Sequence, residues 1–371
     1  MKDIHGLERS LNESLNWNKA RLNCFLKMLL ALFAVKTVNL KEIALALNGE
    51  VKMESNYRRL QRFFGQFKLD LTQIARWIFK LSIQADEKFY LVMDRTNWYW
   101  EKKKINVFVL GIAYEGMAIP IFWTLLAKAG NSNFEEQRVL LRRFIRTFGK
   151  DRIHGLLGDR EFASGRLFGW LNKQSIPFYI RIKEGSQVCI KQKKLFNAQK
   201  IFKDLSPKTK KEYPMAVWIF GQKVFLAGSR SERGELMIVA TNQAPKTAIA
   251  IYLRRWEIES LFQGLKGRGF RFEETHMTHQ DKIAKVTALL AIGFSWAHKV
   301  GEWRSEKQPI VFKQFKKAFR PEHSYFRYGL DFIRDALFHA EKHIRPCFNI
   351  LIQNIPKLID HYQNTSLVQK L

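Results

Sequence analysis

The sequence predicts a mixed α/β protein in which a sheet domain is interrupted by a mostly β insertion and flanked by helical N-terminal and C-terminal regions. Hydrophobic residues recur with helical spacing toward both ends of the 371-residue chain, whereas its middle contains short apolar runs bounded by turn residues. The composition, with 46% hydrophobic and 13% aromatic residues, supplies enough apolar side chains for a sizeable core. This composition excludes wholesale disorder.

Five regions follow from these patterns. They are a helical region (1–85), the first part of the sheet domain (86–185), a β-rich insertion (186–243), a helix that completes the sheet domain (244–280) and a helical C-terminal region (281–371).

The charge of the chain points to a polyanionic partner. The chain has 63 Lys and Arg against 34 Asp and Glu, which gives a formal net charge of +29. Phosphate contacts release condensed counterions, so nucleic acid is the first candidate partner. The alternative is a basic surface that serves only solubility.

Two short helices are predicted in the first region. The first begins at Asn39, an N-cap candidate with Glu42 three residues on, and stops at Asn48-Gly49. The second covers 55–67 and places three basic residues opposite its apolar face, namely Arg58, Arg59 and Arg62. This pattern is compatible with a helix-turn-helix DNA reader and equally with an ordinary helical hairpin.

The order of elements in 86–185 predicts the type of sheet. The predicted elements are strands at 88–96 and on both sides of a turn within 105–126, a helix at 133–149, a strand at 153–162, a helix at 165–174 and a strand at 177–184. Three strands, a helix and then strand–helix–strand is the order of a ribonuclease H-like α/β sheet.

Two aspartates follow buried strands of this sheet. Asp94 comes after the apolar run FYLVM, and Asp159 comes after HGLLG. Carboxylates at the ends of adjacent strands could hold divalent cations, since Mg²⁺ prefers a few carboxylates together with substrate phosphate oxygens. The alternative for each is a turn or N-cap aspartate.

A third carboxylate lies on a long helix predicted over 247–267. With an advance of about 100° per residue, four of its residues fall on one stripe roughly 60° wide, namely Tyr252, Arg255, Glu259 and Lys266. The rest of the helix is largely apolar, so the helix is buried and its stripe faces a site or a tight network. A simple Arg255–Glu259 salt bridge is the alternative, although it does not account for Lys266.

These motifs together resemble a known family. The spacing Tyr252-x₂-Arg255-x₃-Glu259-x₆-Lys266 is similar to the Y-R-E-K signature of bacterial insertion-sequence DDE transposases, which are cut-and-paste enzymes with a β-strand insertion. DRTNW at 94–98 and GDREF at 158–162 resemble the two aspartate blocks of that family. The resemblance spans about residues 88–280, with the three blocks in the family's order.

The resemblance implies a function and a site. Asp94, Asp159 and Glu259 would be the DDE triad, which coordinates two Mg²⁺ or Mn²⁺ ions. The activity would be cleavage at transposon ends and strand transfer into target double-stranded DNA, carried out by a homodimer on paired ends. Tyr252, Arg255 and Lys266 would contact phosphates near the scissile bond.

Two other functions remain open at this stage. A ribonuclease H-like nuclease or junction resolvase would cut DNA without joining it, and would not need an N-terminal reader. A non-catalytic DNA-binding repressor would not need three intact carboxylates. Short inverted repeats that flank the gene would favour the transposase over both alternatives.

The remaining sequence features give weaker expectations. Three separated cysteines without a CxxC pair indicate neither a zinc site nor a disulfide framework, and no apolar run is long enough for a membrane span, so we expect a cytoplasmic protein that associates with the nucleoid when bound to DNA. Trp98 and Trp218 are predicted in the core. The helix at 282–300 is predicted to pack on the chain's own core, and 332–344 with the tail is predicted to be available for intermolecular contact.

Overall fold

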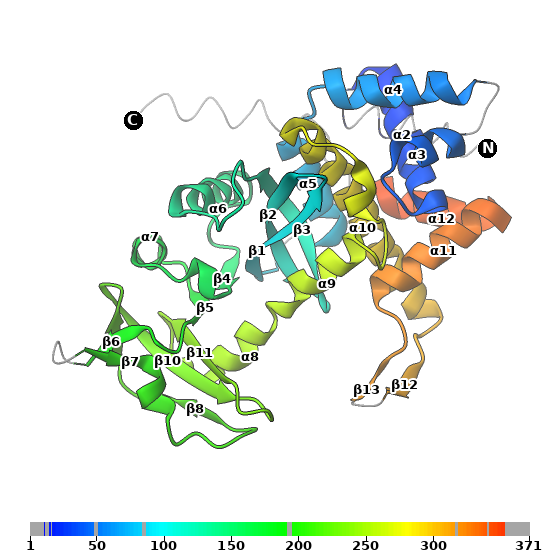
Figure 1. Ribbon diagram of the computed structural model, residues 1–371. Coiled ribbons are helices and arrows are strands. Elements are labelled where there is room, and N and C mark those ends of the chain that lie inside the picture. Colours follow the sequence, from blue (N-terminus) through cyan, green and yellow to red (C-terminus); the bar gives the residue numbers. More distant parts are fainter. Residues whose placement is uncertain are drawn as a thin grey trace, which may run out of the picture. The chain divides into compact units, whose positions relative to one another are not determined.

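The computed structural model describes residues 11, 15, 17–47, 51–83, 87–190, 195–315, 318–339 and 341–352. The chain divides into two compact units, whose elements are labelled in Figure 1. We call residues 86–99 and 104–261 the sheet unit, and residues 1–85, 100–103 and 262–371 the helical unit.

One mixed sheet of 11 strands forms among the described residues, in the order β3-β2-β1-β4-β5-β11-β10-β9-β6-β7, with β8 paired to β10. Its strands are β1 (Phe89–Trp100), β2 (Lys103–Tyr114), β3 (Met117–Leu125), β4 (Ile153–Gly158), β5 (Phe178–Ile182), β6 (Gln187–Cys189), β7 (Leu195–Asn197), β8 (Lys210–Glu212), β9 (Val217–Ile219), β10 (Gln222–Arg230) and β11 (Leu236–Thr241). β4 pairs in parallel with both β1 and β5, whereas β5–β11 and β10–β11 are antiparallel. The strands within 186–243 therefore extend the same sheet.

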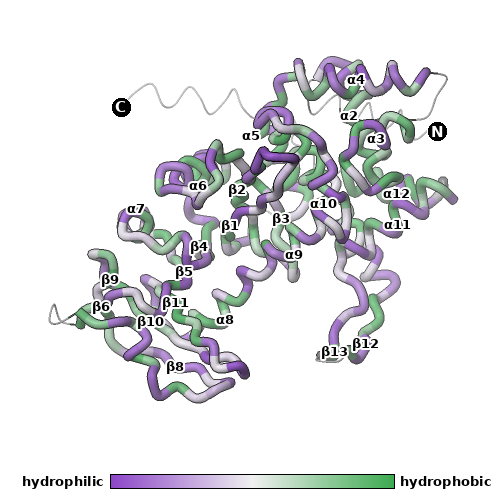
Figure 2. The backbone as a smooth tube through the Cα atoms, in the orientation of Figure 1, coloured by the Kyte–Doolittle hydropathy of each residue, from purple (hydrophilic) through white to green (hydrophobic). Residues whose placement is uncertain are grey.

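The first part of this sheet follows the sequence prediction closely. Parallel strands are covered on both faces, so their sequences are continuous apolar runs. In β1, Leu91, Val92 and Met93 are accordingly fully buried. The helix predicted at 133–149 is α6 (Phe134–Phe148), which begins with an Asn133–Glu136 capping box. Hydrophilic and hydrophobic stretches alternate along α6, as expected for a helix with one buried face (Figure 2).

The prediction of one long helix over 247–267 is wrong. The structure has two helices, α8 (Ala248–Leu253) and α9 (Trp256–Leu265), separated by Arg254 and Arg255. The backbone N–H groups of these two arginines bond to the carbonyl groups three residues earlier, at 3.1 and 2.9 Å, as in a 3₁₀ turn. A short 3₁₀ segment of this kind lets the chain change direction without glycine or proline.

The described part of the helical unit contains seven complete α-helices and a small β-ribbon. They are α2 (Lys19–Val35), α3 (Leu40–Ala46), α4 (Met53–Gln66), α5 (Leu71–Ser82), α10 (Gln280–Lys307), α11 (Tyr325–His339), α12 (Glu341–Ile352) and the ribbon strands β12 (Phe312–Phe315) and β13 (Ala318–Pro321). Every residue of α10 from Lys285 to His298 is buried, which confirms the prediction that 282–300 packs on the chain's own core. The two helices predicted around Asn39 and over 55–67 correspond to α3 and α4, whereas the predicted stop at Asn48-Gly49 lies outside the described residues.

The prediction of a single available helix over 332–344 is also wrong. Residue 339 ends α11 and residue 341 begins α12, so the predicted helix spans parts of two. Buried indole groups hold α12 in place, since Trp77 and Trp296 donate hydrogen bonds to the carbonyl oxygens of Leu351 and Cys347 at 3.2 and 2.7 Å. Helix α12 therefore packs within the helical unit, whereas Phe338 near the end of α11 is exposed. The tail beyond residue 352 lies outside the described part of the chain.

The two tryptophans predicted in the core have different environments. Trp98 is 7% exposed, as predicted, but Trp218 on β9 is 38% exposed. Val217 and Ile219 on either side of Trp218 are buried, and strand side chains alternate between faces, so the indole is directed to the opposite face. Separately, the described helices include none with the length and apolarity required to cross a bilayer.

Candidate active site

The register of β1 and β4 places the two aspartates side by side. The strands pair in parallel as far as Met93 and Gly158, and Asp94 and Asp159 are the next residue on each strand. The sequence predicted that the strand itself ends at Asp94. Instead, β1 continues to Trp100 because β2 still pairs with it beyond this point, and only the pairing with β4 ends.

Backbone amides fix one oxygen of each aspartate. The Asp94 Oδ1 atom accepts a hydrogen bond from the Arg95 amide at 2.7 Å, and Asp159 Oδ1 accepts one from the Arg160 amide at 2.7 Å. Asp159 is also the N-cap of the 3₁₀ turn η1 (Arg160–Phe162). The N-cap interpretation of Asp159 is thus correct, and it is compatible with a second role for the same carboxylate.

Two side chains from the α8–α9 segment connect the aspartates with Glu259. The Arg255 Nη2 atom donates to Glu259 Oε1 at 2.7 Å, and Arg255 Nη1 lies 3.5 Å from Asp94 Oδ2. The Arg255 Nε atom donates to the Tyr252 hydroxyl at 3.2 Å, and this hydroxyl reaches Asp159 Oδ1 at 3.4 Å. Asp94, Asp159, Glu259, Tyr252 and Arg255 therefore form one connected group, which we call the carboxylate cluster.

Burial controls the protonation of the cluster. Burial raises the pKa of Asp94 to about 6, although the Arg95 amide and the Arg255 guanidinium both favour the carboxylate. Burial likewise raises the pKa of Tyr252. Burial lowers the pKa of Arg255, but Tyr252, Glu259 and Asp159 together more than offset it, so the net shift is upward and Arg255 stays charged.

A second arginine links the two aspartate blocks. Arg95 Nε and Nη2 bind both oxygens of Glu161 at 2.7 and 2.6 Å, which is a bidentate pair. Other donors of the same guanidinium reach Asn131 Oδ1 at 2.7 Å and the Gly130 carbonyl at 3.1 Å. Arg95 follows Asp94 directly and Glu161 is two residues after Asp159, so this pair ties together the two segments that carry the aspartates. Neither residue was among the predicted site residues, although both lie inside the motif blocks.

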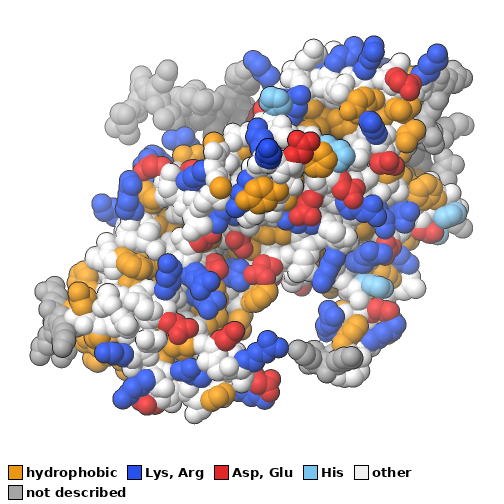
Figure 3. All heavy atoms as spheres, in the orientation of Figure 1, with side chains coloured by type: hydrophobic (Ala, Val, Ile, Leu, Met, Phe, Trp, Pro, Cys, Tyr) orange, Lys and Arg blue, Asp and Glu red, His pale blue; other side chains and the backbone are white. Residues whose placement is uncertain are grey.

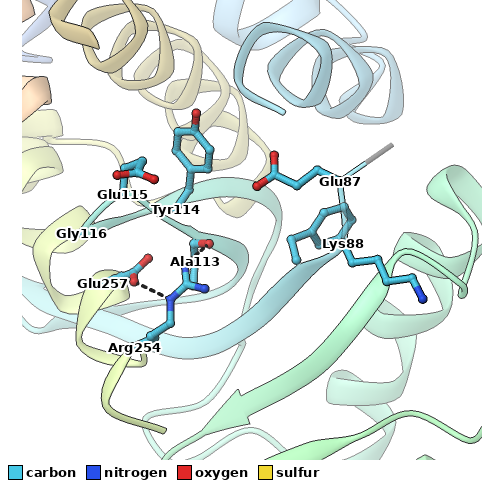
Figure 4. A pocket seen from close by; sticks show the side chains of 9 residues that line it. Glu87, Lys88, Ala113, Tyr114, Glu115, Gly116, Arg254 and Glu257 are labelled. Atoms are coloured by element: carbon cyan, nitrogen blue, oxygen red, sulfur yellow. Dashed lines mark hydrogen bonds and ion pairs between the residues drawn. The ribbon is translucent and has the colours of Figure 1, made fainter. Parts of the chain in front are cut away.

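The neighbouring Arg254 has different partners from Arg255. Its Nε donates to Glu257 Oε1 at 2.9 Å and its Nη2 donates to the Ala113 carbonyl oxygen at 2.9 Å. Figure 4 shows this pair in a cavity of about 370 Å³ that Tyr114 and Glu115 also line. The cavity shares no lining residue with the carboxylate cluster.

The other predicted site residues belong to the helical unit, whereas the cluster belongs to the sheet unit. Lys266 belongs to the helical unit, where its ammonium lies 2.7 Å from Glu273 Oε1. On α4, Arg58 and Arg62 are exposed, whereas Arg59 is tied to α2 through Asn23 Oδ1 at 3.0 Å.

The cluster fits a divalent cation by the chemistry of its donors. Asp94, Asp159 and Glu259 supply hard carboxylate oxygens, which are the ligands that Mg²⁺ and Mn²⁺ prefer. In the arrangement shown here, the part of the chain that the structure describes has no group of three acidic, His or Cys side chains placed to hold a metal ion. The Arg255 guanidinium bridges Asp94 and Glu259, so all three carboxylates could share an ion only after Arg255 releases at least one of them.

The mixed sheet with parallel β1, β4 and β5 and helical ends is a ribonuclease H-like transposase fold. The chain belongs to the family described as the transposase DDE domain, whose model matches residues 86–293, more than half of its length. The family consists of phosphoryl-transfer enzymes, so the protein belongs to that class of enzyme.

Structural comparison finds a similar solved protein. The structure is the cryo-EM structure of the piggyBac transposase synaptic complex with hairpin DNA. The similarity covers 95% of this chain and 80% of that chain, at 9% sequence identity and a TM-score of 0.43. No curated protein matches the chain in a sequence search.

Proposed function

We propose that the protein is a DNA transposase that cuts transposon ends and transfers the strands into target DNA, with Asp94, Asp159 and Glu259 as its catalytic carboxylates. The observation that supports this most strongly is the carboxylate cluster itself. Adjacent parallel strands bring the two aspartates together, and the turn between α8 and α9 directs Tyr252 and Arg255 to them.

Each member of the cluster has a proposed role. Asp94, Asp159 and Glu259 would hold two Mg²⁺ or Mn²⁺ ions. When bound, such ions activate the attacking water or DNA 3′-hydroxyl and stabilise the leaving oxygen. Tyr252 orients Asp159 through its hydroxyl, and Arg255 balances the charge of Asp94 and Glu259 while the site is empty of DNA.

The DNA contacts belong to the same proposal. Arg255 and Tyr252 are buried, so they would meet only a phosphate that enters the site, as the scissile phosphate must. Lys266 is proposed to bind a phosphate near the scissile bond, and Arg58, Arg59 and Arg62 are proposed to bind phosphates elsewhere on the DNA. Among the α4 arginines, Arg58 and Arg62 are the better candidates because they are exposed. We also propose that two protomers act together on paired ends.

Two neighbouring glutamates of α9 provide a matched test. Glu259 and Glu257 each pair with an arginine, at 2.7 and 2.9 Å, but only Glu259 belongs to the cluster. We expect Glu259→Gln to reduce cleavage and joining of DNA copied from the gene's flanks by roughly 100-fold or more. Glu257→Gln should keep both activities, and both variants should bind the DNA as the native protein does.

Each of the other possible outcomes of this experiment would show which part of the proposed function is wrong. Glu259→Gln with normal Mg²⁺-dependent cleavage would disprove the triad. A native protein that cuts without ever joining strands would be a nuclease or resolvase, and one that binds the flanking DNA but never cuts it would be a repressor.

A further inference from the structure

The β12–β13 ribbon is the element of the helical unit that the proposed function leaves without a role. It connects the end of α10, at Lys307, with the start of α11, at Tyr325 (Figure 1). The ribbon is a two-stranded sheet with no further strand on either edge among the described residues. An isolated two-stranded hairpin is only marginally stable in water. The stability of the ribbon therefore does not explain why it carries exposed aromatic and basic side chains.

The base of the ribbon is held firmly by two closely packed helices. A Cβ atom on Gly329 of α11 would lie 1.8 Å from the Ala297 carbonyl oxygen of α10, and one on Gly301 of α10 would lie 1.9 Å from the Tyr325 carbonyl oxygen. At the foot of the ribbon, the Glu322 amide donates to the Val311 carbonyl oxygen at 2.9 Å. The ribbon thus extends from a rigid base.

One face of the ribbon is aromatic and exposed. The pairing Phe312–Pro321 and Gln314–Phe319 places these four residues on the same face, because directly opposed residues in a sheet share a face. Phe312 is 53% exposed and Phe319 is 66% exposed, and their ring centres lie 5.5 Å apart.

The other face carries two cations that oppose each other. Lys313 and Arg320 form a directly opposed pair, and both are exposed. Like charges in this position destabilise a ribbon, although the ion pair between Lys313 and Glu322 relieves part of the repulsion. The Arg320 guanidinium also lies 4.3 Å from the centre of the Phe315 ring on this face. A phosphate group between Lys313 and Arg320 would relieve the repulsion that remains. Figure 3 shows basic and hydrophobic side chains together over this part of the surface.

We propose that the β12–β13 ribbon is a DNA-contacting element that inserts into a groove of duplex DNA, with Lys313 and Arg320 on the phosphates and Phe312 and Phe319 against sugars and base edges. A groove of B-DNA admits a two-stranded ribbon, and apolar side chains are used as wedges between base steps. A second copy of the chain is disfavoured as the occupant, because it would bring another basic ribbon and another net charge of +29 to the same place. The proposal rests on the proposed function only in taking DNA as the substrate.

Two double variants test the two faces separately, by fluorescence anisotropy with a labelled duplex copied from the gene's flanks. Lys313→Gln/Arg320→Gln should weaken binding and reduce the slope of log affinity against log salt by about 1.8, since each lost phosphate contact contributes about 0.9. Phe312→Ser/Phe319→Ser should weaken binding roughly 10-fold with the salt slope unchanged. The four replaced side chains are exposed, so both variants should fold, which circular dichroism would verify.

Matched controls remove the same groups elsewhere. Phe338→Ser removes a phenyl ring that is 55% exposed on α11, and Lys150→Gln/Lys173→Gln removes two exposed charges from the sheet unit. Affinities of both ribbon variants within twofold of these controls would overturn the proposal while leaving the carboxylate cluster untouched. A ribbon variant that changes the DNA-free oligomeric state by light scattering, and not the DNA affinity, would show a subunit interface and would also overturn it. If the native protein showed no salt-dependent DNA binding, the proposed function and this proposal would both be wrong.

Discussion

Three arginines near the candidate site differ in the acceptors that they reach, and these acceptors set their roles. Arg255 contacts Asp94 and Glu259, whereas Arg254, one residue earlier, contacts Glu257 and a strand carbonyl group. Arg95 binds Glu161 and so connects the segments that carry the two aspartates. Adjacent residues of the same type can therefore have unrelated functions, and the sequence gives their order but not their acceptors.

The Arg95–Glu161 pair should be strongly coupled. Its side chains are 11% and 17% exposed, so removal of one partner leaves a poorly solvated charge. We expect Arg95→Ala and Glu161→Ala each to lower the free energy of unfolding by about 3 kcal/mol, and the double variant to lower it little further. Urea denaturation of the four proteins measures the coupling.

A solvent-exposed pair of the sheet unit serves as the control for this cycle. Arg166 and Glu135 are 71% and 48% exposed and lie 2.9 Å apart. Their coupling should be at most about 1 kcal/mol, as for other surface ion pairs. If the Arg95–Glu161 coupling were no larger, the pair would not hold the two aspartate segments together.

At the scale of helices and strands, the sequence correctly predicted the features that depend on residues close together in the chain. The capping box at Asn133 defined the start of α6, and the apolar runs defined β1 and β4. The interruption between α8 and α9 carries no such signal, because neither glycine nor proline marks it. Its cause is tertiary, since the two arginines there bond to partners on other elements, including the Ala113 carbonyl group.

The same reasoning applies to the site. Apolar runs predicted that Asp94 and Asp159 lie at adjacent strands, and helical spacing predicted that Tyr252, Arg255 and Glu259 share one stripe. Only the family resemblance implied that these two groups meet. The position of Lys266 relative to them depended on one continuous helix over 247–267, whereas the chain forms two helices there, so its place stays a prediction. The exposed position of Trp218 could have been inferred from its neighbours, since it alternates with two apolar residues along β9.

Packing of α10 against α11 gives a prediction at this scale. Gly329→Ala places a methyl group 1.8 Å from a backbone oxygen of Ala297, which cannot be accommodated without separating the helices. We expect a loss of about 3 kcal/mol or more in the free energy of unfolding.

Gly65→Ala on α4 is the control, because its Cβ meets nothing within 4 Å. It should raise stability by up to about 1 kcal/mol. Equal effects of both changes on the melting temperature would contradict the close approach of α10 and α11.

For the whole molecule, the structure changes the view of how protomers could assemble. The C-terminal helices are part of the helical unit's core, as the buried Cys347 and Leu351 show. Removal of everything after about residue 325 would expose that core, so a truncated protein would be destabilised and would not show whether these helices pair the protomers. The net charge of +29 favours monomers without DNA and paired protomers once phosphates neutralise them, which remains a prediction for light scattering with and without DNA.

The central claim is that Asp94, Asp159 and Glu259 form one metal-binding site in the DNA-bound protein. Titration with Mn²⁺, followed by electron paramagnetic resonance at pH 8, measures this directly, because the pKa of Asp94 is about 6 and the carboxylate is then ionised. We expect native protein to bind Mn²⁺ when DNA is present, and Asp94→Asn, Asp159→Asn and Glu259→Gln each to weaken binding by roughly 10-fold or more. Glu257→Gln should bind as the native protein does. Native-like Mn²⁺ binding by the Glu259→Gln protein would contradict the account.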